Sequence, residues 1–208
     1  MPGFYSTHMF PRLMDWAMGT RRFREQRQQA LAPLYGRVLE IGFGTGLNLP
    51  HYPQRVTWLT AVDPAQLLPR RVSQRSVEAP MPLELVHVSA ECLPFEEARF
   101  DCALSTWTLC TIPDAVRALR EVRRVLKPKG LLVFLEHGLG VDPKVATWQK
   151  RLNPIQRVLA CGCNINRPID ALIQEAGLEI TRLERFQMEG TPRIVSQMYR
   201  GTASAAKA

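Results

Sequence analysis

The chain has 208 residues, 46% of them hydrophobic and 22% charged, which is typical of a globular protein with a packed core and excludes a disordered chain. It contains no run of about 18 apolar residues, and residues 1–10 contain no basic segment followed by an apolar run. Neither a transmembrane helix nor a secretory signal is therefore expected. We expect one cytoplasmic domain over residues 1–208.

The formal net charge of +8 favours anionic partners, but the distribution of the basic residues argues against nucleic acid. The arginines fall in groups on separate predicted helices, as they do on solvated helix faces. No aromatic residues are interleaved with them for base stacking. We expect no nucleic-acid partner, whereas peripheral contact with a membrane surface stays open.

The five cysteines have irregular spacings and predict reduced thiols rather than a disulfide framework. Cys161 and Cys163 form a single C-x-C pair, and no second pair with ligand spacing follows. No metal site is therefore expected. Cys110 and Cys163 are interpreted as small buried hydrophobic residues, with thiols lining a pocket as the alternative.

The predicted elements begin with helix over residues 9–32, broken near Gly19, within an N-terminal cap of residues 1–33. Strands and helices then alternate. Strands are expected at 37–41, 56–62, 83–88, 100–105 and 131–136, and helices directly after residue 46, at 65–79 and at 114–126. The Pro- and Gly-containing turn Lys127–Gly130 is expected to end the last of these helices. Such alternation predicts a parallel α/β sheet.

The pattern changes after residue 137. A helix at 145–160 has no strand before it and is interpreted as part of an inserted cover, residues 138–165. A helix at 168–176 follows, and then strands at 179–187 and 193–200. A turn at Gly190–Pro192 is short enough to join these two strands as an antiparallel hairpin. The small, polar residues after Gly201 predict a disordered tail.

A glycine-rich loop follows the first predicted strand, with the sequence Glu-Ile-Gly-Phe-Gly-Thr-Gly over residues 40–46. Glycines let the backbone turn sharply and approach a ligand closely. A dinucleotide fingerprint needs a glycine where the chain has Leu47, and a P-loop needs a lysine directly after Gly46. Glu40 would repel a pyrophosphate. The loop therefore favours a cationic ligand without phosphate.

Asp63 ends the second predicted strand, about 20 residues after the loop, where a carboxylate accepts hydrogen bonds from both ribose hydroxyls. A turn or N-cap role before Pro64 is the alternative. Open α/β sheets bind ligands at the carboxyl ends of their strands, and all of these residues lie there in the predicted fold.

Several motifs together resemble those of class I S-adenosylmethionine (SAM)-dependent methyltransferases with a methyltransferase type 11 domain. The run Val38–Gly46 resembles their motif I, Ala61–Pro64 their second motif, Ser89–Phe95 with Phe100–Cys102 their third and the start of their fourth, and Leu119–Gly130 the helix and turn before strand five. The resemblance covers roughly residues 36–200. It implies a doubly wound, Rossmann-like seven-stranded sheet of order 3-2-1-4-5-7-6 with strand 7 antiparallel.

The resemblance also implies SAM as the cofactor and S-adenosylhomocysteine as its product. Glu40 and Gly42 would lie beside the methionine part, Asp63 at the ribose, Ala90 and Glu91 at the adenine. The implied cofactor-binding set is Glu40, Gly42, Phe43, Gly44, Gly46, Asn48, Asp63, Pro64, Ala90, Glu91, Thr106 and Leu109, the last two bordering the methyl end. Arg24 is a further candidate, as a partner of the SAM carboxylate, with an exposed surface arginine as the alternative.

The later segments Leu135–Gly138, Trp148–Pro154 and Cys161–Arg167 resemble the microsomal alkyl thiol methyltransferase family in their Glu-His, Trp-Gln…Pro and Gly-Cys-Asn…Arg arrangements. That family carries an N-terminal membrane anchor, which is not expected here. The resemblance implies a small-molecule thiol as the methyl acceptor. His137 is the candidate catalytic base, with a histidine that fixes the insert as the alternative.

Three other functions stay open. The first is N-methylation of a small amine or of a phospholipid headgroup. The second is a protein that binds SAM without turnover. The third is RNA methylation, suggested by the net charge, although the Asn/Asp-Pro-Pro-Tyr type of motif is absent from residues 105–108, which read Ser-Thr-Trp-Thr.

Overall fold

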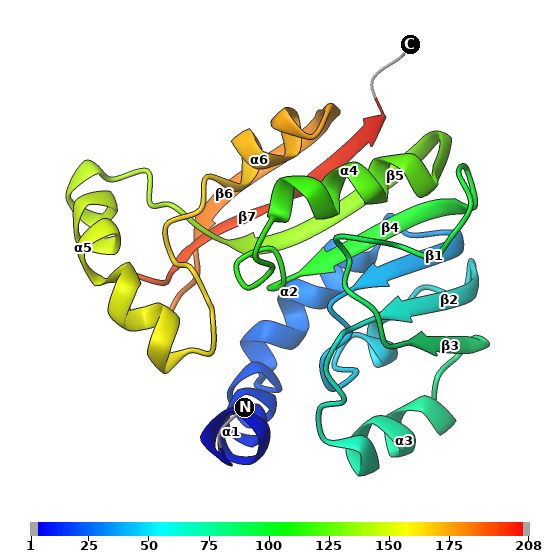
Figure 1. The fold of residues 1–208 in the computed structure, drawn as a ribbon, viewed down its shortest axis with the longest axis horizontal. Helices are drawn as coiled ribbons and strands as arrows, with labels where there is room; N and C mark the ends of the chain where they lie inside the picture. The colour runs from blue at the N-terminus through cyan, green and yellow to red at the C-terminus, as the bar shows by residue number, and fades with distance from the viewer. Residues whose placement is uncertain (1–3, 206–208) are drawn as a thin grey trace.

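The computed structural model describes residues 4–205 and contains a seven-stranded sheet of order β3-β2-β1-β4-β5-β7-β6 (Figure 1). The strands are β1 (Gly36–Ile41), β2 (Val56–Val62), β3 (Leu83–Val86), β4 (Phe100–Thr106), β5 (Leu126–His137), β6 (Leu178–Gln187) and β7 (Gln197–Ala205). β7 runs antiparallel to both of its neighbours, whereas β1 to β5 pair in parallel. The predicted fold class is confirmed.

Helices cover both faces of the sheet. They are η1 (Tyr5–Met9), α1 (Phe10–Met18), α2 (Arg21–Leu31), η2 (Leu49–His51), α3 (Pro69–Val77), α4 (Ala115–Val125), α5 (Pro143–Leu159) and α6 (Ile169–Glu175). Apolar residues of α2 and α3 pack on one face, and those of α4 and α6 pack on the other. Parallel strands buried on both faces need this double cover. Among residues 4–205, no helix is long and apolar enough to cross a membrane.

α4 follows its predicted pattern closely. Asp114 is its N-cap and accepts a hydrogen bond from the Arg117 backbone N–H at 2.9 Å. The helix ends at Val125, and β5 begins at once, with Leu126 opposite Phe100. The predicted start of this strand at residue 131 is therefore five residues late. The turn-like residues 127–130 belong to the strand, in which Lys129 has a φ of +65°.

The predictions for the C-terminal strand were wrong in two respects. β7 runs from Gln197 to Ala205, so Gly201 begins no disordered tail but lies within the strand. The connection from β6 spans residues 188–196 and is longer than the predicted tight turn. β7 pairs with β5 on one side and β6 on the other, and these two ladders outweigh its weak strand propensities. A Cβ at Gly201 would approach the Arg182 carbonyl oxygen to 2.1 Å, so the close packing requires glycine.

The carboxyl ends of the parallel strands point toward α1 and α5 (Figure 1). α5 lies within the predicted insert and is fixed by Gln149, whose side chain is fully buried. Gln149 donates to the carbonyls of Gly138 and Ile194 and accepts from the Gly140 N–H at 2.7 Å. The segment after β5, the β6–β7 connection and α5 are thereby joined at one end of the sheet.

Candidate functional site

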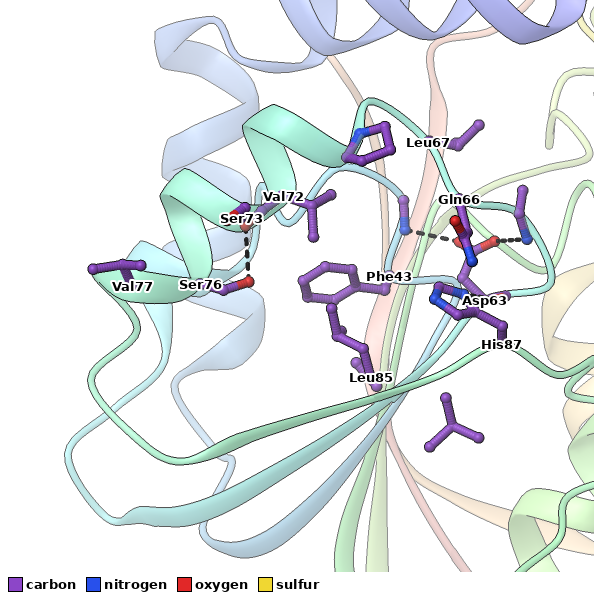
Figure 2. Close-up of a pocket in the computed structure, with 15 residues that line it drawn as sticks. Phe43, Asp63, Gln66, Leu67, Val72, Ser73, Ser76, Val77, Leu85 and His87 are labelled. Carbon is purple, nitrogen blue, oxygen red and sulfur yellow. Dashed lines mark hydrogen bonds between the residues drawn. The ribbon is translucent and has the colours of Figure 1, made fainter.

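A cavity with a volume of about 730 Å³ lies at this end of the sheet. Its wall begins at the glycine loop after β1 and continues past the ends of β2, β4 and β5 to α5 and the β6–β7 connection. A second cavity of about 480 Å³ lies between α3 and β3 and shares Phe43, Gly44 and Asp63 with the first (Figure 2). The large cavity therefore has one end at the glycine loop and one at the insert.

The glycine loop has the backbone that its sequence predicts. Gly42, Gly44 and Gly46 have φ values of +75°, +59° and +78°, in the left-handed region that favours glycine. A Cβ at Gly42 would lie 2.2 Å from Thr108 side-chain atoms, whereas a Cβ at Gly44 would meet no atom within 4 Å. Gly44 lines both cavities, so the open space over it belongs to the site.

Asp63 lies at the end of β2, and its carboxylate is fixed by backbone N–H groups. One oxygen accepts from Gly44 at 2.8 Å and the other from Ala65 at 2.9 Å (Figure 2). Burial raises the pKa of Asp63, and the two backbone hydrogen bonds offset part of that effect. Each carboxylate oxygen has capacity for a further donor. Asp63 and the neighbouring Pro64 line the cavity, as the sequence predicts.

Glu40 is fully buried behind the loop and is not part of the cavity wall. Its carboxylate accepts from Asn48 and from the Tyr52 hydroxyl, both at 2.7 Å. Burial raises the pKa of Glu40 to about 7. Asn48 also donates to the Thr106 hydroxyl at 2.9 Å and lines the cavity. Glu40 thus supports a wall residue, and its predicted direct place beside a ligand stays a prediction.

The basic residue in the wall is Arg27, not Arg24. Arg24 is exposed and does not line the cavity, whereas Arg27 is 4% exposed and does. Arg27 donates to the Asn48 side-chain oxygen at 3.0 Å and to the Met18 carbonyl at 2.7 Å, and its guanidinium lies 4.8 Å from the Trp107 ring centroid. Burial lowers its pKa to about 10. Phe23 and Leu31, one turn away on either side, mark this helix face as buried, and this spacing identifies Arg27 in the sequence.

Of the two residues predicted to lie at the adenine, Ala90 and Glu91, only one lines the cavity. Ala90 is buried and lines the cavity. Glu91 does not line it, because its carboxylate accepts from the Ser89 hydroxyl at 2.9 Å and from the Asp114 backbone N–H at 2.8 Å. Its predicted contact with adenine stays a prediction.

Of the two residues predicted to border the methyl end, Thr106 and Leu109, again only one lines the cavity. Thr106 lines the cavity, whereas Leu109 is fully buried in the core on the α4 side. The buried carboxylate of Glu136 holds this segment by accepting from the Ser105 hydroxyl at 2.6 Å and from the Thr108 N–H at 2.9 Å. Burial raises the pKa of Glu136 to about 7.

The N-terminal helices form part of the wall. Asp15 of α1 is 5% exposed and accepts from the Thr45 hydroxyl at 2.5 Å and from Arg75 at 2.7 Å, with a further ion pair to Arg71. These bonds tie α1 to the glycine loop and to α3. The Tyr5 hydroxyl donates to the Leu159 carbonyl of α5 at 2.9 Å. The N-terminal cap is therefore connected to the glycine loop at one end of the cavity and to α5 of the insert at the other.

The insert end of the cavity contains His137 beside two thiols. His137 Nε2 lies 3.2 Å from Cys163 Sγ, and Cys110, which is 2% exposed, lies next to Cys163. Contacts with Cys110 and His137 lower the pKa of Cys163, while the contact with Cys163 and burial raise that of Cys110. Burial disfavours the charged form of His137, but Cys163 and Glu136 together outweigh this effect and raise the pKa of His137. His137 Nδ1 is buried and has no hydrogen-bond partner among the described residues.

The rest of the insert end is mainly apolar. Its wall includes the side chains of Ile165, Met188, Val195 and Met198. The acidic residues in the cavity wall, among those described, are Asp15 and Asp63, and both have the partners given above. The insert end therefore offers a pair of thiols and an imidazole among mainly apolar side chains. Its described wall residues include no carboxylate, although the buried Glu136 lies behind the wall.

A family model described as "Methyltransferase domain" matches residues 39–134, the stretch from β1 into β5. Thiol S-methyltransferase TMT1A of Homo sapiens is 30% identical over 157 residues, which are 72% of this chain and 63% of that protein. Phosphatidylethanolamine N-methyltransferase of Cereibacter sphaeroides is 29% identical over 147 residues, 70% of this chain and 71% of that protein. The chain thus spans less than two thirds of the human relative's length.

The fold is also found in solved structures. N-methyltransferase NodS of Bradyrhizobium japonicum, solved in complex with S-adenosylhomocysteine, superposes with a TM-score of 0.69 at 18% identity. The match covers 92% of each chain. This likeness shows the fold.

Proposed function

We propose that this chain, which belongs to the class I SAM-dependent methyltransferases, transfers the methyl group of SAM to the sulfur of a small apolar thiol. The observation that carries the proposal is the chemistry of the insert end of the cavity: thiols and an imidazole among apolar side chains, with no carboxylate among the described wall residues there. Both the methyl transfer from SAM and the acceptor are part of the proposal, and the family supports the first.

The glycine-loop end of the cavity fits SAM. Open space over Gly44, where a Cβ would have no protein neighbour, leaves room for a ligand against the loop. Asp63 has oxygens fixed by backbone N–H groups and available to ribose hydroxyls, and Ala90 supplies an apolar surface for a base. No cluster of basic side chains for a pyrophosphate lines this end, among the described residues. These features suit a nucleoside without phosphates.

Bound SAM supplies a methyl group on a sulfonium, which reacts by in-line displacement. The chain's own task is then to align the acceptor and exclude water. Trp107, with a φ of +49°, and Thr108 both line the cavity. The Thr108 N–H donates to the Glu136 carboxylate, and the Trp107 N–H donates to the Leu135 carbonyl at 2.9 Å. The buried Arg27 adds positive charge, which favours the thiolate of an acceptor whose ordinary pKa is about 8.5. His137 is the residue that we expect to act on the acceptor.

The surroundings of the cavity also support an apolar acceptor. η1 and α5 meet at the Tyr5–Leu159 contact, and α1 directly follows η1. Large apolar side chains are exposed on all three helices: Met9, Leu13 and Trp16 on η1 and α1, and Trp148, Ile155 and Val158 on α5. Exposed apolar patches of this kind mark binding surfaces. A hydrophobic thiol would reach the cavity past these side chains.

N-methylation of a phospholipid headgroup is the second candidate, because a phosphatidylethanolamine N-methyltransferase is almost as similar as the thiol enzymes. A headgroup amine is a cation before it reacts and would favour a carboxylate beside it. The lack of one among the described residues of the insert end disfavours this acceptor.

Two measurements test the proposal in sequence. Calorimetric titration with SAM and S-adenosylhomocysteine should show binding, and no heat with either would remove the cofactor assignment. Mass spectrometry of reactions with thiols, amines, phenols and phospholipids should then detect a gain of CH₂ on thiols. Products confined to amines or phospholipids would replace the first candidate with the second, and SAM binding without any product would favour a non-catalytic protein.

A further inference from the structure

We infer that Cys110, His137 and Cys163 form a zinc site in the acceptor end of the cavity, with one coordination position open toward the cavity. The three ligand atoms lie within 4.8 Å of one another, and the closest measured pair, His137 Nε2 and Cys163 Sγ, is 3.2 Å apart. Tetrahedral zinc with bonds of about 2.3 Å to sulfur and about 2.0 Å to nitrogen separates neighbouring ligand atoms by about 3.5 to 3.8 Å. Small side-chain movements suffice.

The donor set is characteristic of zinc. Two thiolates neutralise the charge of Zn²⁺, and imidazole completes a Cys₂His set of the kind that catalytic zinc sites use with a fourth, exchangeable ligand. Cysteine and histidine in a three-residue set of this composition do not suit magnesium or calcium, which prefer oxygen ligands. All three side chains line the large cavity, so the remaining position faces the space where an acceptor would bind.

The backbone holds the ligands together independently of any contact between their side chains. The backbone N–H and the side-chain amide of Asn164 both donate to the Cys110 carbonyl, each at 2.9 Å. Arg167 donates to the carbonyls of Leu109 and Pro113 on either side of Cys110. The two cysteine segments are therefore fixed against each other before a metal binds, as an effective metal site requires.

The second ring nitrogen of His137 lies apart from the proposed metal. His137 Nδ1 is buried and has no hydrogen-bond partner among residues 4–205. Zinc bound at Nε2, the nitrogen beside Cys163, would leave the ring proton on Nδ1. The proposed site therefore rests on the three ligand atoms and on the cavity beside them, not on Nδ1.

The role of the metal rests on the proposed function, although its binding does not. The acceptor R–SH would bind zinc through sulfur and release its proton to solvent, so that a thiolate forms at neutral pH. A sulfur electron pair would then form the new S–CH₃ bond as the bond between that carbon and the sulfonium sulfur breaks, leaving S-adenosylhomocysteine. The neutral thioether product binds zinc weakly and would leave. His137 would thus act as a ligand rather than as the base that the sequence suggests.

The test measures metal binding without SAM or acceptor. The reduced full chain is stripped with a chelator, titrated with Zn²⁺ and analysed by mass spectrometry for bound metal; Co²⁺ is the spectroscopic probe. We expect one zinc per chain and, with cobalt, thiolate-to-metal charge transfer with the d–d bands of a tetrahedral ion. Cys110→Ala, Cys163→Ala and His137→Ala should each lower zinc affinity by about 100-fold or more, since even outer-shell changes cost 10–100-fold.

Cys161→Ala is the matched control, because Cys161 is exposed and lies two residues from Cys163 but outside the cluster. It should bind zinc like the unmodified chain, and calorimetry with SAM shows that each variant is folded. Absence of stoichiometric zinc, or equal loss in the Cys161 variant, overturns the zinc site even if thiols are methylated. Zinc binding without thiol methylation overturns the proposed acceptor instead, and leaves the site intact.

Discussion

The two ends of the cavity are built in different ways. The glycine-loop end uses backbone N–H groups and a carboxylate from the residues that follow β1 and β2. Asn48 joins these to Glu40, to Thr106 of β4 and to Arg27 of α2. The insert end brings side chains from three segments into apolar surroundings: Cys110 after β4, His137 at the end of β5 and Cys163 after α5. In the proposed function, the first end binds SAM and the second binds the acceptor.

The largest effect is expected from Gly42→Ala. The new Cβ would lie 2.2 Å from Thr108 at a φ of +75°, so strain and overpacking should together lower the free energy of unfolding by about 3 kcal/mol. Gly44→Ala has no clash and should cost only about 1 kcal/mol from its φ of +59°. It should nevertheless weaken SAM binding, because its Cβ enters the cavity. Urea unfolding and calorimetry measure the two effects, and equal destabilisation would contradict this difference.

The raised pKa of Glu40, at the glycine-loop end, should make the free energy of unfolding depend on pH. Its pKa is about 7 in the folded chain and 4.5 ordinarily, so the folded chain holds a proton that the unfolded chain has released. Stability should therefore fall as pH rises from 4.5 to about 7, and this contribution should be constant above that range. Over this pH range, the free energy of unfolding of the unmodified chain should fall by on the order of 3 kcal/mol relative to that of the Glu40→Gln variant. Urea unfolding at several pH values tests this, and parallel curves for the two proteins would contradict it.

Asp63→Asn should weaken SAM binding by about 30-fold, because one or two hydrogen bonds to a charged group, together worth about 2 kcal/mol, are lost. Glu91→Gln is the matched comparison, since the sequence places both acids at the cofactor but only Asp63 lines the cavity. Calorimetry should find the affinity of the Gln variant within about 3-fold of the unmodified chain, given the small effects typical of changes outside a site. A larger loss for Glu91 than for Asp63 would reverse the assignment.

Arg27→Gln should lower SAM affinity by about 5-fold, the smallest of these effects, since Asn48 loses a partner but keeps its bonds to Glu40 and Thr106. Arg24→Gln should leave the affinity unchanged, because Arg24 is exposed and outside the wall. The same calorimetric titration compares the two variants. An effect at Arg24 alone would restore the original interpretation of the sequence.

The glycine-loop end was predictable because its signals are local. A strand, a loop with three left-handed glycines and an acid at the end of the next strand follow one another within 24 residues, from Glu40 to Asp63. These local patterns predicted the positions of Gly42, Gly44 and Asp63 at the carboxyl ends of the strands, whereas the order of the sheet was implied by the family resemblance. Glu91 and Leu109 carry no comparable local signal of the direction in which a side chain points, and neither lines the cavity.

The insert end was not predictable in the same way. Cys110 and Cys163 are 53 residues apart, and His137 lies between them, so no spacing rule connects the three. The C-x-C pair drew attention to Cys161, which the structure leaves exposed and outside the cluster. The error at β7 has the same origin, because Gly201–Ala205 has weak strand propensity and is ordered by β5 and β6 on either side.

The most direct test of the central claim is a competition between an alkanethiol and the alkylamine of the same carbon chain, supplied together with SAM and analysed by mass spectrometry. The two acceptors share their apolar contacts and differ only in the reacting atom and its charge. We expect the S-methyl product, with little or no N-methylation. N-methylation in preference to S-methylation would contradict the assignment of the acceptor end to a thiol.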